Sequence, residues 1–403
     1  MIRLLRNEIY DKEGENAAYD GPTEFTYGAD NNIQAIQLRG LDYDDPLYEQ
    51  VLDEVSLQDM LNTYCALMNS NEDIVMPKEN GADSPVGLLG TIGKYTAGTI
   101  YEVAEDDPSY GHSTAVYVSE NVVAATFSHE LSSEQGRLIG NAGLWDGYTE
   151  WNAPGLNIHR NQYNARNLEY YSEDPILTGA MGANVYRQAV AHGMVVAGKH
   201  FAFNDQETNR DGVAVFLGEQ AARENELRAF QGAMENNYAQ GIMTGFNRLG
   251  TVYSGASEAS QVQVARNEWG FEGWIVTDMI NGADYMNWRD IVFGGGGGCL
   301  TTSAYESANI GSMTSTENLK LIAKDSAFQK KMKETIKYFV YNTVASNDMN
   351  TITTSTKYIH VLTWWQIAFM AAEVVFGLLT LLFAVMYLRN SLRKKTVYVK
   401  EDK

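Results

Sequence analysis

The chain has 403 residues, of which 44% are hydrophobic and 11% aromatic, so it can bury a large core. Its formal net charge of −21 excludes nucleic acid as a partner, because phosphate binding needs clustered Lys and Arg. Two cysteines, Cys65 and Cys299, form no disulfide framework and match no zinc spacing, so both are expected to be small buried side chains. We expect one α/β domain of roughly 250 to 350 residues with appendages.

Residues 1–30 are polar, contain Gly and lack a regular apolar pattern, which is typical of an interdomain connection. Met1–Arg6 is too short and too polar to be the apolar core of a signal peptide. We therefore expect an N-terminal tail or remnant linker here. Either a further part of the protein precedes it, or export depends on an apolar span near the C-terminus.

From Asn31 onward, apolar runs alternate with segments of helical spacing. Strands are predicted at 33–38, 115–123 and 155–158, and three clearer ones at 193–201, 241–246 and 273–278. Helices are predicted at 47–67, 128–139, 219–236 and 258–269, the second of them opened by a Ser128 cap and Glu130. Strands that recur with helices between them indicate βαβ units and a parallel sheet.

The three clearer strands end in residues that a plain core would not contain. Asp278 closes the run Gly273–Val276 and Thr277, where it is either a catalytic group or the cap of a helix or turn. Lys199 and His200 are adjacent, so on a regular strand they would point to opposite faces. To serve one site, both must lie where the strand gives way to its loop. Taken separately, the Lys would be solvated and the His a hydrogen-bonded core residue.

Several motifs then occur in a recognisable order. They are Pro154–Asn161 (PGLNIHRN), Ala165–Pro175 (ARNLEYYSEDP), Lys199–Arg210 (KHFAFNDQETNR) and Val276–Asp278 (VTD). The sequence resembles glycoside hydrolase family three, from about Leu61 to Asp278 and more weakly to about Asn350. The resemblance covers the barrel domain of a β-glucosidase-like enzyme, of the type whose barrel is C-terminal and followed by a membrane anchor. We expect a TIM-like (β/α)8 barrel over residues 31–345, with an imperfect first strand.

The resemblance implies a role for seven residues. Asp278 would be the nucleophile of a retaining β-glycosidase, which needs a second acid roughly 5 Å away to protonate the leaving oxygen. The sugar of a β-glycoside or oligosaccharide would be held by Asp83, Arg166, Lys199 and His200, with Met243 and Phe246 lining the same subsite. Lys199 and Arg166 would also keep nearby carboxylates ionised. No metal or cofactor is implied.

The sequence departs from the family pattern in four places. Ser84 stands where Gly is common, and Tyr163–Ala165 replaces a Gly-rich approach to Arg166. Phe246 occupies a place often held by Tyr. Gly294–Gly298, followed by Cys299 and Leu300, lies where Gly-Gly-Asp-Leu is common, so an acidic group is expected to be absent there and the run to be a flexible barrel loop.

The general acid is the larger gap. In the family it comes from an α/β sandwich domain, for which the residues after Asp278 leave no room, so a partner polypeptide or an upstream domain would supply it. The alternative is an acid inside the barrel, with Glu169, Glu173 and Asp205 as candidates. A rival function is a membrane-tethered carbohydrate-binding protein with impaired turnover.

The C-terminal region predicts a membrane anchor. Trp364–Leu388 is almost wholly apolar, and at about 1.5 Å per residue a helix of this length exceeds the roughly 30 Å hydrocarbon core. We divide the region into a polar stalk at 346–362, a transmembrane helix at 363–388 and a basic tail at 389–403. The basic tail predicts a cytoplasmic C-terminus, with the barrel outside a single-pass cell-membrane anchor. Glu373 inside the span either pairs with a partner helix or is tolerated there in its neutral form.

Overall fold

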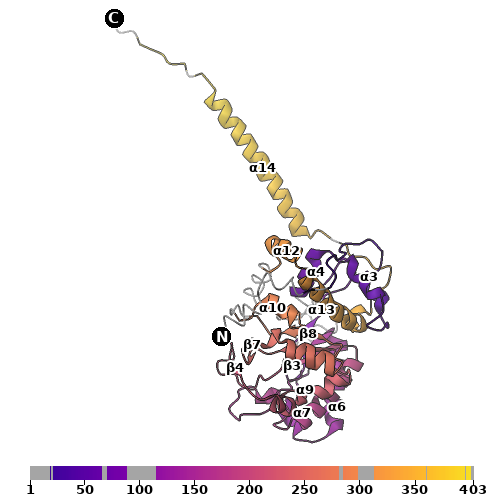
Figure 1. Ribbon diagram of the computed structural model, residues 1–403. Coiled ribbons are helices and arrows are strands. Elements are labelled where there is room, and N and C mark those ends of the chain that lie inside the picture. Colours follow the sequence, from indigo (N-terminus) through magenta and orange to yellow (C-terminus); the bar gives the residue numbers. More distant parts are fainter. Residues whose placement is uncertain are drawn as a thin grey trace. The chain divides into compact units, whose positions relative to one another are not determined.

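The computed structural model describes residues 19, 21–65, 70–88, 115–280, 285–297, 313–359, 361–394 and 396–400. The chain divides into two compact units, Met1–Thr356 and Lys357–Lys403, which we describe separately. Figure 1 shows the first unit as packed helices and strands and the second as one long helix. The tail predicted at residues 1–30 lies largely outside the described residues.

The first described elements are helical rather than extended. The strand predicted at 33–38 is wrong, because the structure has a 3-10 helix, η1 (Ala35–Leu38), whose buried residues Ala35 and Leu38 are three apart, as one helical turn requires. The single helix predicted from 47 is two helices, α3 (Leu47–Glu54) and α4 (Leu57–Cys65). Val55 leaves the helix in an extended conformation, and the Ser56 hydroxyl then accepts from Asp59 N at 3.1 Å to cap α4.

A parallel five-stranded sheet forms the centre of the first unit. Its strands are β1 (Gly81–Ala82), β2 (Glu150–Trp151), β3 (Val195–Phe201), β5 (Gly241–Thr244) and β8 (Trp274–Thr277), in that spatial order. Every neighbouring pair is parallel. The three clearer predicted runs contain β3, β5 and β8, so those strand predictions are confirmed. The α/β class with a mostly parallel sheet is confirmed with them.

Two weaker strand predictions fare differently. The strand predicted at 115–123 is wrong: residues 115–119 are irregular and a helix, α5 (Glu120–Ala124), follows. The Ser119 carbonyl accepts from both Val122 N and Val123 N, which turns the chain into the helix. The run predicted at 155–158 contributes only bridges from Gly155, one of which pairs it with Lys199 of β3.

Helices cover both faces of the sheet (Figure 1). On one face, Val196, Ile242 and Ile275 pack with α6 (His129–Asp146), α7 (Pro175–Ala191) and α9 (Arg228–Glu235). Gly198 is required there, because a Cβ would lie 1.4 Å from the Tyr186 hydroxyl of α7. Ser128 caps α6 as predicted, by accepting from Leu131 N.

On the other face, α4 and α13 (Ser326–Ala345) pack against Ala197, Met243 and Val276. The rings of Trp274 and Phe339 meet edge to face at 6.0 Å. In the described residues the sheet is open, with β1 and β8 at its two edges, so the closed eight-stranded barrel is not observed there. α13 packs on the face of this sheet opposite to the one that α6, α7 and α9 cover.

Smaller elements complete the first unit. A second sheet has the order β4 (Ala214–Val215), β6 (Arg248–Leu249) and β7 (Val252–Tyr253). The predicted helical segment at 219–236 contains α8 (Glu219–Ala221), η3 (Ala222–Glu226) and α9. The segment at 258–269 contains η5 (Ala259–Glu268). Both η3 and η5 are π-helical. The remaining elements are η2 (Asn167–Glu169), η4 (Ser254–Ala256), α10 (Trp288–Phe293), α12 (Thr316–Ile322) and η6 (Asn347–Met349).

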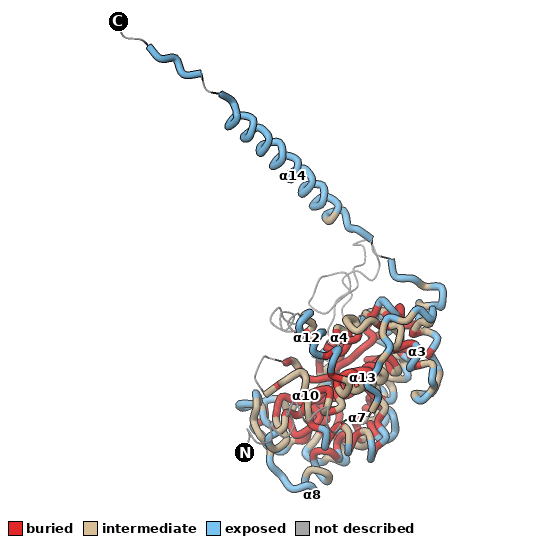
Figure 2. The backbone as a smooth tube through the Cα atoms, turned by 45° about the horizontal axis from the view of Figure 1, so that its top comes forward, coloured by how far each residue is buried: buried red, intermediate tan, exposed pale blue. Residues whose placement is uncertain are grey.

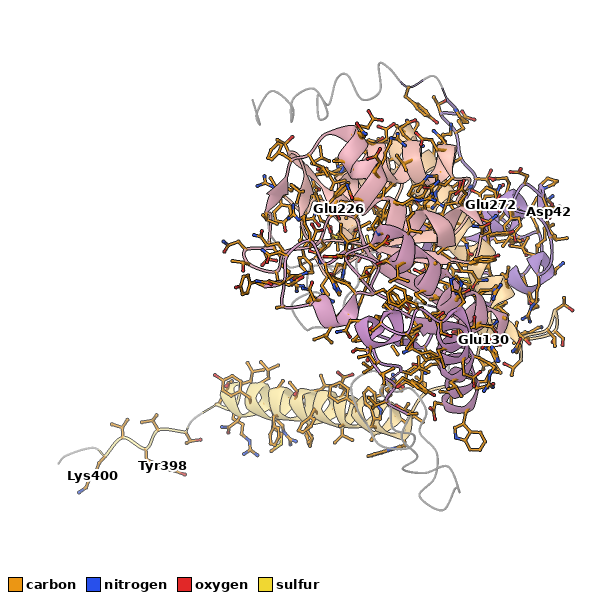
Figure 3. All side chains as sticks on the ribbon, turned by 90° about the horizontal axis from the view of Figure 1, so that it is seen from below. Asp42, Glu130, Glu226, Glu272, Tyr398 and Lys400 are labelled. Atoms are coloured by element: carbon orange, nitrogen blue, oxygen red, sulfur yellow. The ribbon has the colours of Figure 1, made fainter. Side chains whose placement is uncertain are left out.

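The boundary between domain and stalk lies later than residue 345. Ser346 and Met349 are buried, and η6 packs on α13. The described part of the second unit holds α14 (Trp364–Ser391), a 28-residue helix long and apolar enough to cross a membrane. Figure 2 colours α14 as exposed along nearly its whole length. Tyr398 and Lys400 follow it in the tail (Figure 3).

Candidate functional site

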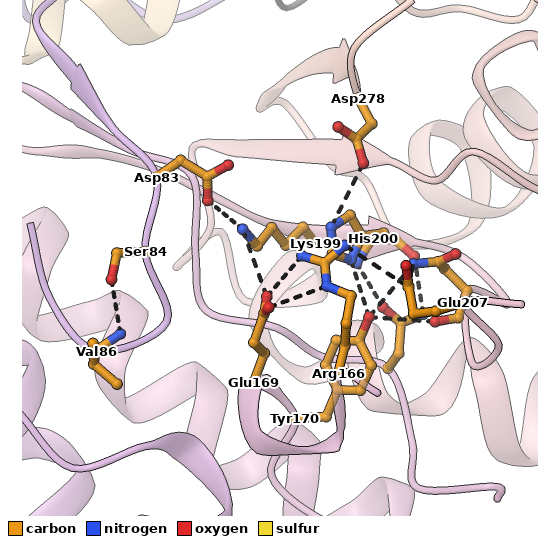
Figure 4. Close-up of polar contacts among 12 residues, drawn as sticks. Asp83, Ser84, Val86, Arg166, Glu169, Tyr170, Lys199, His200, Glu207 and Asp278 are labelled. Atoms are coloured by element: carbon orange, nitrogen blue, oxygen red, sulfur yellow. Dashed lines mark hydrogen bonds and ion pairs between the residues drawn. The ribbon is translucent and has the colours of Figure 1, made fainter. Parts of the chain in front are cut away.

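The five charged or imidazole side chains expected in one site do lie together (Figure 4). Asp83 follows β1 directly, Lys199 and His200 belong to β3, Asp278 follows β8, and Arg166 precedes η2. Because the carboxyl ends of parallel strands meet at one edge of a sheet, three separate strands bring their side chains to the same place. The cluster therefore depends on the sheet order rather than on sequence proximity.

Lys199 is the buried cation of the cluster. Its side chain is 2% exposed, and its ammonium forms an ion pair with Asp83 Oδ1. Glu169 Oε2 lies 3.9 Å from the same ammonium. The Asp83 side chain is 50% exposed, so it faces the space outside the cluster while it neutralises Lys199.

Both Lys199 and His200 serve this cluster although they are sequence neighbours. The register of β3 against β5 shifts between Lys199 and Phe201, so the strict alternation of side chains breaks at this point. Asn157 then holds the main chain of His200: its Oδ1 accepts from His200 N at 2.7 Å, and its Nδ2 donates to His200 O at 3.0 Å. Lys199 and His200 therefore lie at the end of β3, where the sequence analysis expected both side chains to reach one site.

Arg166 is fixed by two carboxylates. Its Nε and Nη2 donate to the two oxygens of Glu169 at 3.1 and 2.7 Å, a bidentate pair. Glu207 Oε1 lies 3.9 Å from Arg166 Nη1, and Glu207 Oε2 accepts from Arg210 Nη1 at 3.0 Å. Opposite charges thus alternate through the cluster, which keeps the guanidinium of Arg166 rigid.

His200 links the cluster to Asp278. Its Nε2 lies 3.7 Å from Asp278 Oδ2, and its Nδ1 lies 3.3 Å from the Tyr170 hydroxyl. Burial holds the pKa of His200 well below its usual range, and the charges of Arg166 and Lys199 lower it further, so the ring is neutral. A neutral ring that faces a carboxylate is favoured with its proton on Nε2, which leaves Nδ1 to accept from Tyr170.

Asp278 extends the ladder of β8 by one bond, since its N donates to Thr244 O at 3.2 Å. Its carboxylate accepts from Met279 N at 2.8 Å. Burial raises the pKa of Asp278 to about 6, and the Met279 N–H together with the charges of Lys199 and Arg166 limits that rise. At neutral pH the group is therefore largely ionised and dehydrated, which suits a nucleophile.

Met243 and Phe246, the two apolar residues expected to line the subsite, are buried beside this cluster. Met243 is 1% exposed and is the register partner of Lys199 on one side and of Val276 on the other. Phe246 is 2% exposed, and the guanidinium of Arg210 lies 4.2 Å from the centre of its ring. Phe246 thus supports a cation of the cluster rather than offering a hydroxyl to it.

The departures from the family pattern have local explanations. Ser84 is buried, and its hydroxyl accepts from Val86 N at 3.2 Å, so it shapes the turn after Asp83. Tyr163 is 84% exposed. The flexible loop expected at Gly294–Gly298 is wrong for its described part: Gly297 N donates to Ile275 O at 3.0 Å, so the chain runs beside β8. Gly298, Cys299 and Leu300 lie outside the described residues.

The three internal candidates for a general acid are each engaged or remote. Glu169 already binds Arg166 and Lys199. Glu173 is exposed and directly precedes Asp174, which caps α7 by accepting from Ile176 N at 2.7 Å. Asp205 is buried and forms an ion pair with Arg160 at 2.6 Å.

Sequence reasoning missed several members of the cluster. Tyr170, Asn204, Glu207 and Arg210 all make contacts in it, and Asn204 Nδ2 donates to both Glu207 at 3.3 Å and Tyr170 at 3.4 Å. The missed residues lie inside the motifs 165–175 and 199–210, so those motifs were the available signal.

Two further observations concern a separate cavity and possible metal ligands. A cavity of about 1170 Å³ lies between the second sheet and the helices η3 and η5, and none of the residues of the cluster lines it. No group of His, Cys, Asp or Glu within the described residues could hold a metal ion.

Part of the chain is similar in sequence to known proteins. Residues 110–290 match the model of the glycosyl hydrolase family 3 N terminal domain. A β-glucosidase of Ruminococcus albus is 35% identical over 157 residues, which is 39% of this chain and 17% of that protein. β-Glucosidase A of Butyrivibrio fibrisolvens is 32% identical over 171 residues, 42% of this chain and 21% of that protein. The chain thus spans about a fifth of the length of these relatives.

Solved structures share the fold. A β-glucosidase of Paenibacillus barengoltzii superposes with a TM-score of 0.67 at 21% identity, covering 87% of this chain and 38% of that chain. β-Glucosidase 3B of Thermotoga neapolitana, in complex with α-D-glucose, gives a TM-score of 0.61 at 25% identity and covers 73% of this chain and 42% of that chain. Residues 110–290 therefore resemble the glycosyl hydrolase family 3 N terminal domain, and the chain shares the α/β fold of these solved structures.

Proposed function

We propose that the chain is a retaining β-glycosidase that acts on terminal β-linked sugars, because residues 110–290 match the glycosyl hydrolase family 3 N terminal domain. The observation that supports this most directly is the position of Asp278, an ionisable, dehydrated carboxylate held among Lys199, Arg166 and His200 at the carboxyl ends of the strands. The relatives reported above are β-glucosidases, so a β-glucoside is the first substrate to test.

In the proposed reaction, a carboxylate oxygen of Asp278 forms a bond with the anomeric carbon while the glycosidic C–O bond breaks. The leaving oxygen takes a proton from a general acid. Water then attacks the glycosyl-enzyme, gives its proton to the same group and releases the sugar with the original anomeric configuration.

The side chains around Asp278 would hold the sugar. Asp83, half exposed, would accept from hydroxyls, while Lys199, Arg166 and the Nε2–H of His200 would donate. All four groups are already fixed by ion pairs or hydrogen bonds, so little side-chain entropy remains to be lost on binding. Hydrogen bonds that strengthen as charge develops would lower the barrier.

We further propose that the general acid comes from another domain or a partner polypeptide. The engagement of Glu169 and Asp205 in ion pairs and the position of Glu173 beside the α7 cap support this. A general acid contributes about 10² to 10⁴ in rate, most of all with poor leaving groups. Without it, the chain would cleave aryl glycosides of acidic phenols far better than alkyl glycosides, and azide would speed the breakdown of the glycosyl-enzyme.

Covalent labelling tests the nucleophile. The full chain is incubated with a 2-deoxy-2-fluoro-β-glucoside carrying a good leaving group, and peptides are analysed by mass spectrometry. The expected result is one adduct on Asp278, absent from Asp278→Asn. Sugar binding without an adduct would instead favour a carbohydrate-binding protein with impaired turnover. A glycosylation rate independent of leaving-group acidity would mean that an internal acid acts.

We also propose that α14 anchors the protein in the cell membrane, with the domain outside. Its apolar length and the basic residues Arg389, Arg393 and Lys394 at its C-terminal end support this orientation. The chain should stay in the membrane pellet after alkaline carbonate extraction. Protease added to intact cells should remove the domain and spare the tail, and a protected domain would overturn the orientation.

A further inference from the structure

The polar residues of α14 are not scattered. Within its apolar part, Gln366, Glu373, Thr380 and Tyr387 are each seven residues apart. Besides the two Trp residues at the start of the helix, they are the side chains there that carry a hydrogen-bonding group. Residues seven apart in a helix lie on one face, two turns apart, so these four form a single line.

Aromatic residues repeat with the same period. Phe369, Phe376 and Phe383 each follow a member of the polar line by three residues. Gly377 and Ala384, both small, follow Glu373 and Thr380 by four, and a Cβ at Gly377 would meet nothing within 4 Å. The polar line and the three Phe residues together, Gln366, Phe369, Glu373, Phe376, Thr380, Phe383 and Tyr387, are called the heptad stripe below.

Such a repeat has a defined structural meaning. A strict seven-residue period with alternating spacings of three and four keeps one seam facing a neighbouring helix in a left-handed supercoil. Side chains at the remaining positions are mostly aliphatic, as lipid contact requires. A helix that only anchored a domain would not need either the period or a carboxyl group in hydrocarbon.

The described structure leaves the stripe unpartnered. Glu373 is exposed and makes no hydrogen bond or ion pair with the described residues, and Phe376 and Phe383 are 68% and 63% exposed. The Thr380 hydroxyl donates to Phe376 O at 2.8 Å, which leaves its oxygen free to accept. Gln366 Oε1 accepts from Thr363 N at 2.8 Å, and its amide nitrogen can still donate.

We propose that the heptad stripe pairs with the same stripe of a second copy of this chain, in parallel and in register. An amide, a neutral carboxyl group and a hydroxyl each contain both a donor and an acceptor, so each polar residue can bond with its own copy directly opposite. In the neutral form, two Glu373 carboxyl groups satisfy each other in hydrocarbon. The Phe residues pack between these polar layers, and Gly377 and Ala384 allow close approach of the two backbones.

A second copy fits the stripe better than a different partner. A partner that compensated an ionised Glu373 would need to supply a Lys or Arg at one depth, and this would leave the regular recurrence of Gln, Thr and Tyr unexplained. Identical chains with one orientation in the membrane can only pair in parallel, which puts equal residues at equal depth. The inference rests on the membrane anchor proposed above.

Oxidative cross-linking in membranes tests the pairing. Thr380→Cys in the stripe is compared with Leu378→Cys, which lies two residues away on the opposite face at nearly the same depth, both in the full chain with Cys299→Ser. We expect disulfide-linked dimer from Thr380→Cys at a yield at least about five-fold above that of Leu378→Cys. Equal yields at the two positions, or no dimer at either, would overturn the pairing.

Substitution of Glu373 tests the chemistry. Glu373→Gln keeps a donor and an acceptor and should retain association, measured by co-purification of two differently tagged copies from one membrane. Glu373→Leu should weaken it by roughly 3- to 30-fold. Association unchanged in Glu373→Leu, or lost in Glu373→Gln, would contradict the hydrogen-bonded seam, and the latter result would point to an ionised Glu373 with a basic partner.

The same preparation separates this inference from the anchor. A chain released by carbonate extraction would show that α14 does not span the membrane. A chain that remains in the membrane without stripe-specific cross-links would leave the anchor in place and refute the pairing. Neither result bears on labelling of Asp278, which belongs to the first unit.

Discussion

Several places in the described part of the first unit bury carboxyl groups, and two of them stabilise opposite protonation states. Asp278 lies near Lys199, Arg166 and Arg210, whose charges limit the rise of its pKa to about 6. Asp205 and Glu226 lie against each other with Arg160 as the cation that pairs with Asp205. Figure 3 labels Glu226 among the side chains of this unit, where it is 4% exposed.

The second arrangement, here called the acid pair, keeps a proton. Burial, together with the neighbouring charge of Asp205, raises the pKa of Glu226 to about 8. Glu226 is therefore neutral at neutral pH and lies beside Asp205. The comparison teaches that burial beside another carboxyl group keeps a proton on Glu226, whereas burial among cations leaves Asp278 ionised at neutral pH.

The largest expected effect separates the two places by activity. Asp278→Asn should lower kcat for an aryl β-glucoside by about 10³-fold or more, because an amide cannot form the glycosyl-enzyme. Glu226→Gln is the matched control, since it is the same acid-to-amide change in the acid pair, and its kcat should stay within about two-fold of the parent. Comparable losses of kcat in both variants would contradict the different roles assigned to Asp278 and to the acid pair.

A smaller effect is expected from the two arginines. Arg166→Lys loses the bidentate pair with Glu169 and should lower kcat/KM by roughly 10- to 100-fold, because a charged hydrogen bond contributes about 1.5 to 3 kcal/mol. Arg160→Lys in the acid pair should leave kcat/KM nearly unchanged. Steady-state kinetics of both variants measure this, and a larger loss from Arg160→Lys would mean that the acid pair takes part in binding.

The pH dependence sharpens the role of the cations. The nucleophile must be ionised, so kcat/KM should fall below a midpoint near pH 6, about tenfold per pH unit. Because Lys199 is one of the charges that lower the pKa of Asp278, Lys199→Met should move the midpoint upward by up to about 1 unit. A midpoint that stays in place or moves down in Lys199→Met would contradict the electrostatic account.

The smallest effect concerns stability. A carboxyl group whose pKa is raised in the folded protein favours the folded state at low pH, and this contribution is lost as the pH rises through the raised value. For Glu226 that loss begins above the ordinary pKa of 4.5 and is complete near pH 8, with a slope of at most about 1 kcal/mol per pH unit. Denaturant unfolding from pH 6 to 9 should show a steeper decline in the free energy of unfolding for the parent than for Glu226→Gln. Parallel curves would rule out the raised pKa of Glu226.

Local patterns in the sequence predicted more of the site than of the sheet. Asp83, Arg166, Lys199, His200 and Asp278 were found from short motifs, and the structure brings them together. The signals at 33–38 and 115–123 were misread, because apolar residues two or three apart suit both a strand and a turn of helix. Only tertiary packing, against α13 for the first segment and of α5 for the second, decides between a strand and a turn of helix.

Sequence alone determined the features that depend on one stretch of chain: the apolar length of α14, the Ser128 cap of α6, and the three strands rich in β-branched residues. Tertiary structure decided the features that require contact between residues far apart in the sequence. The register shift that turns Lys199 and His200 to one site needs β5 beside β3, and the acid pair joins residues 21 positions apart. Burial and neighbouring charge set the pKa of each carboxyl group, and both exist only once the chain has folded.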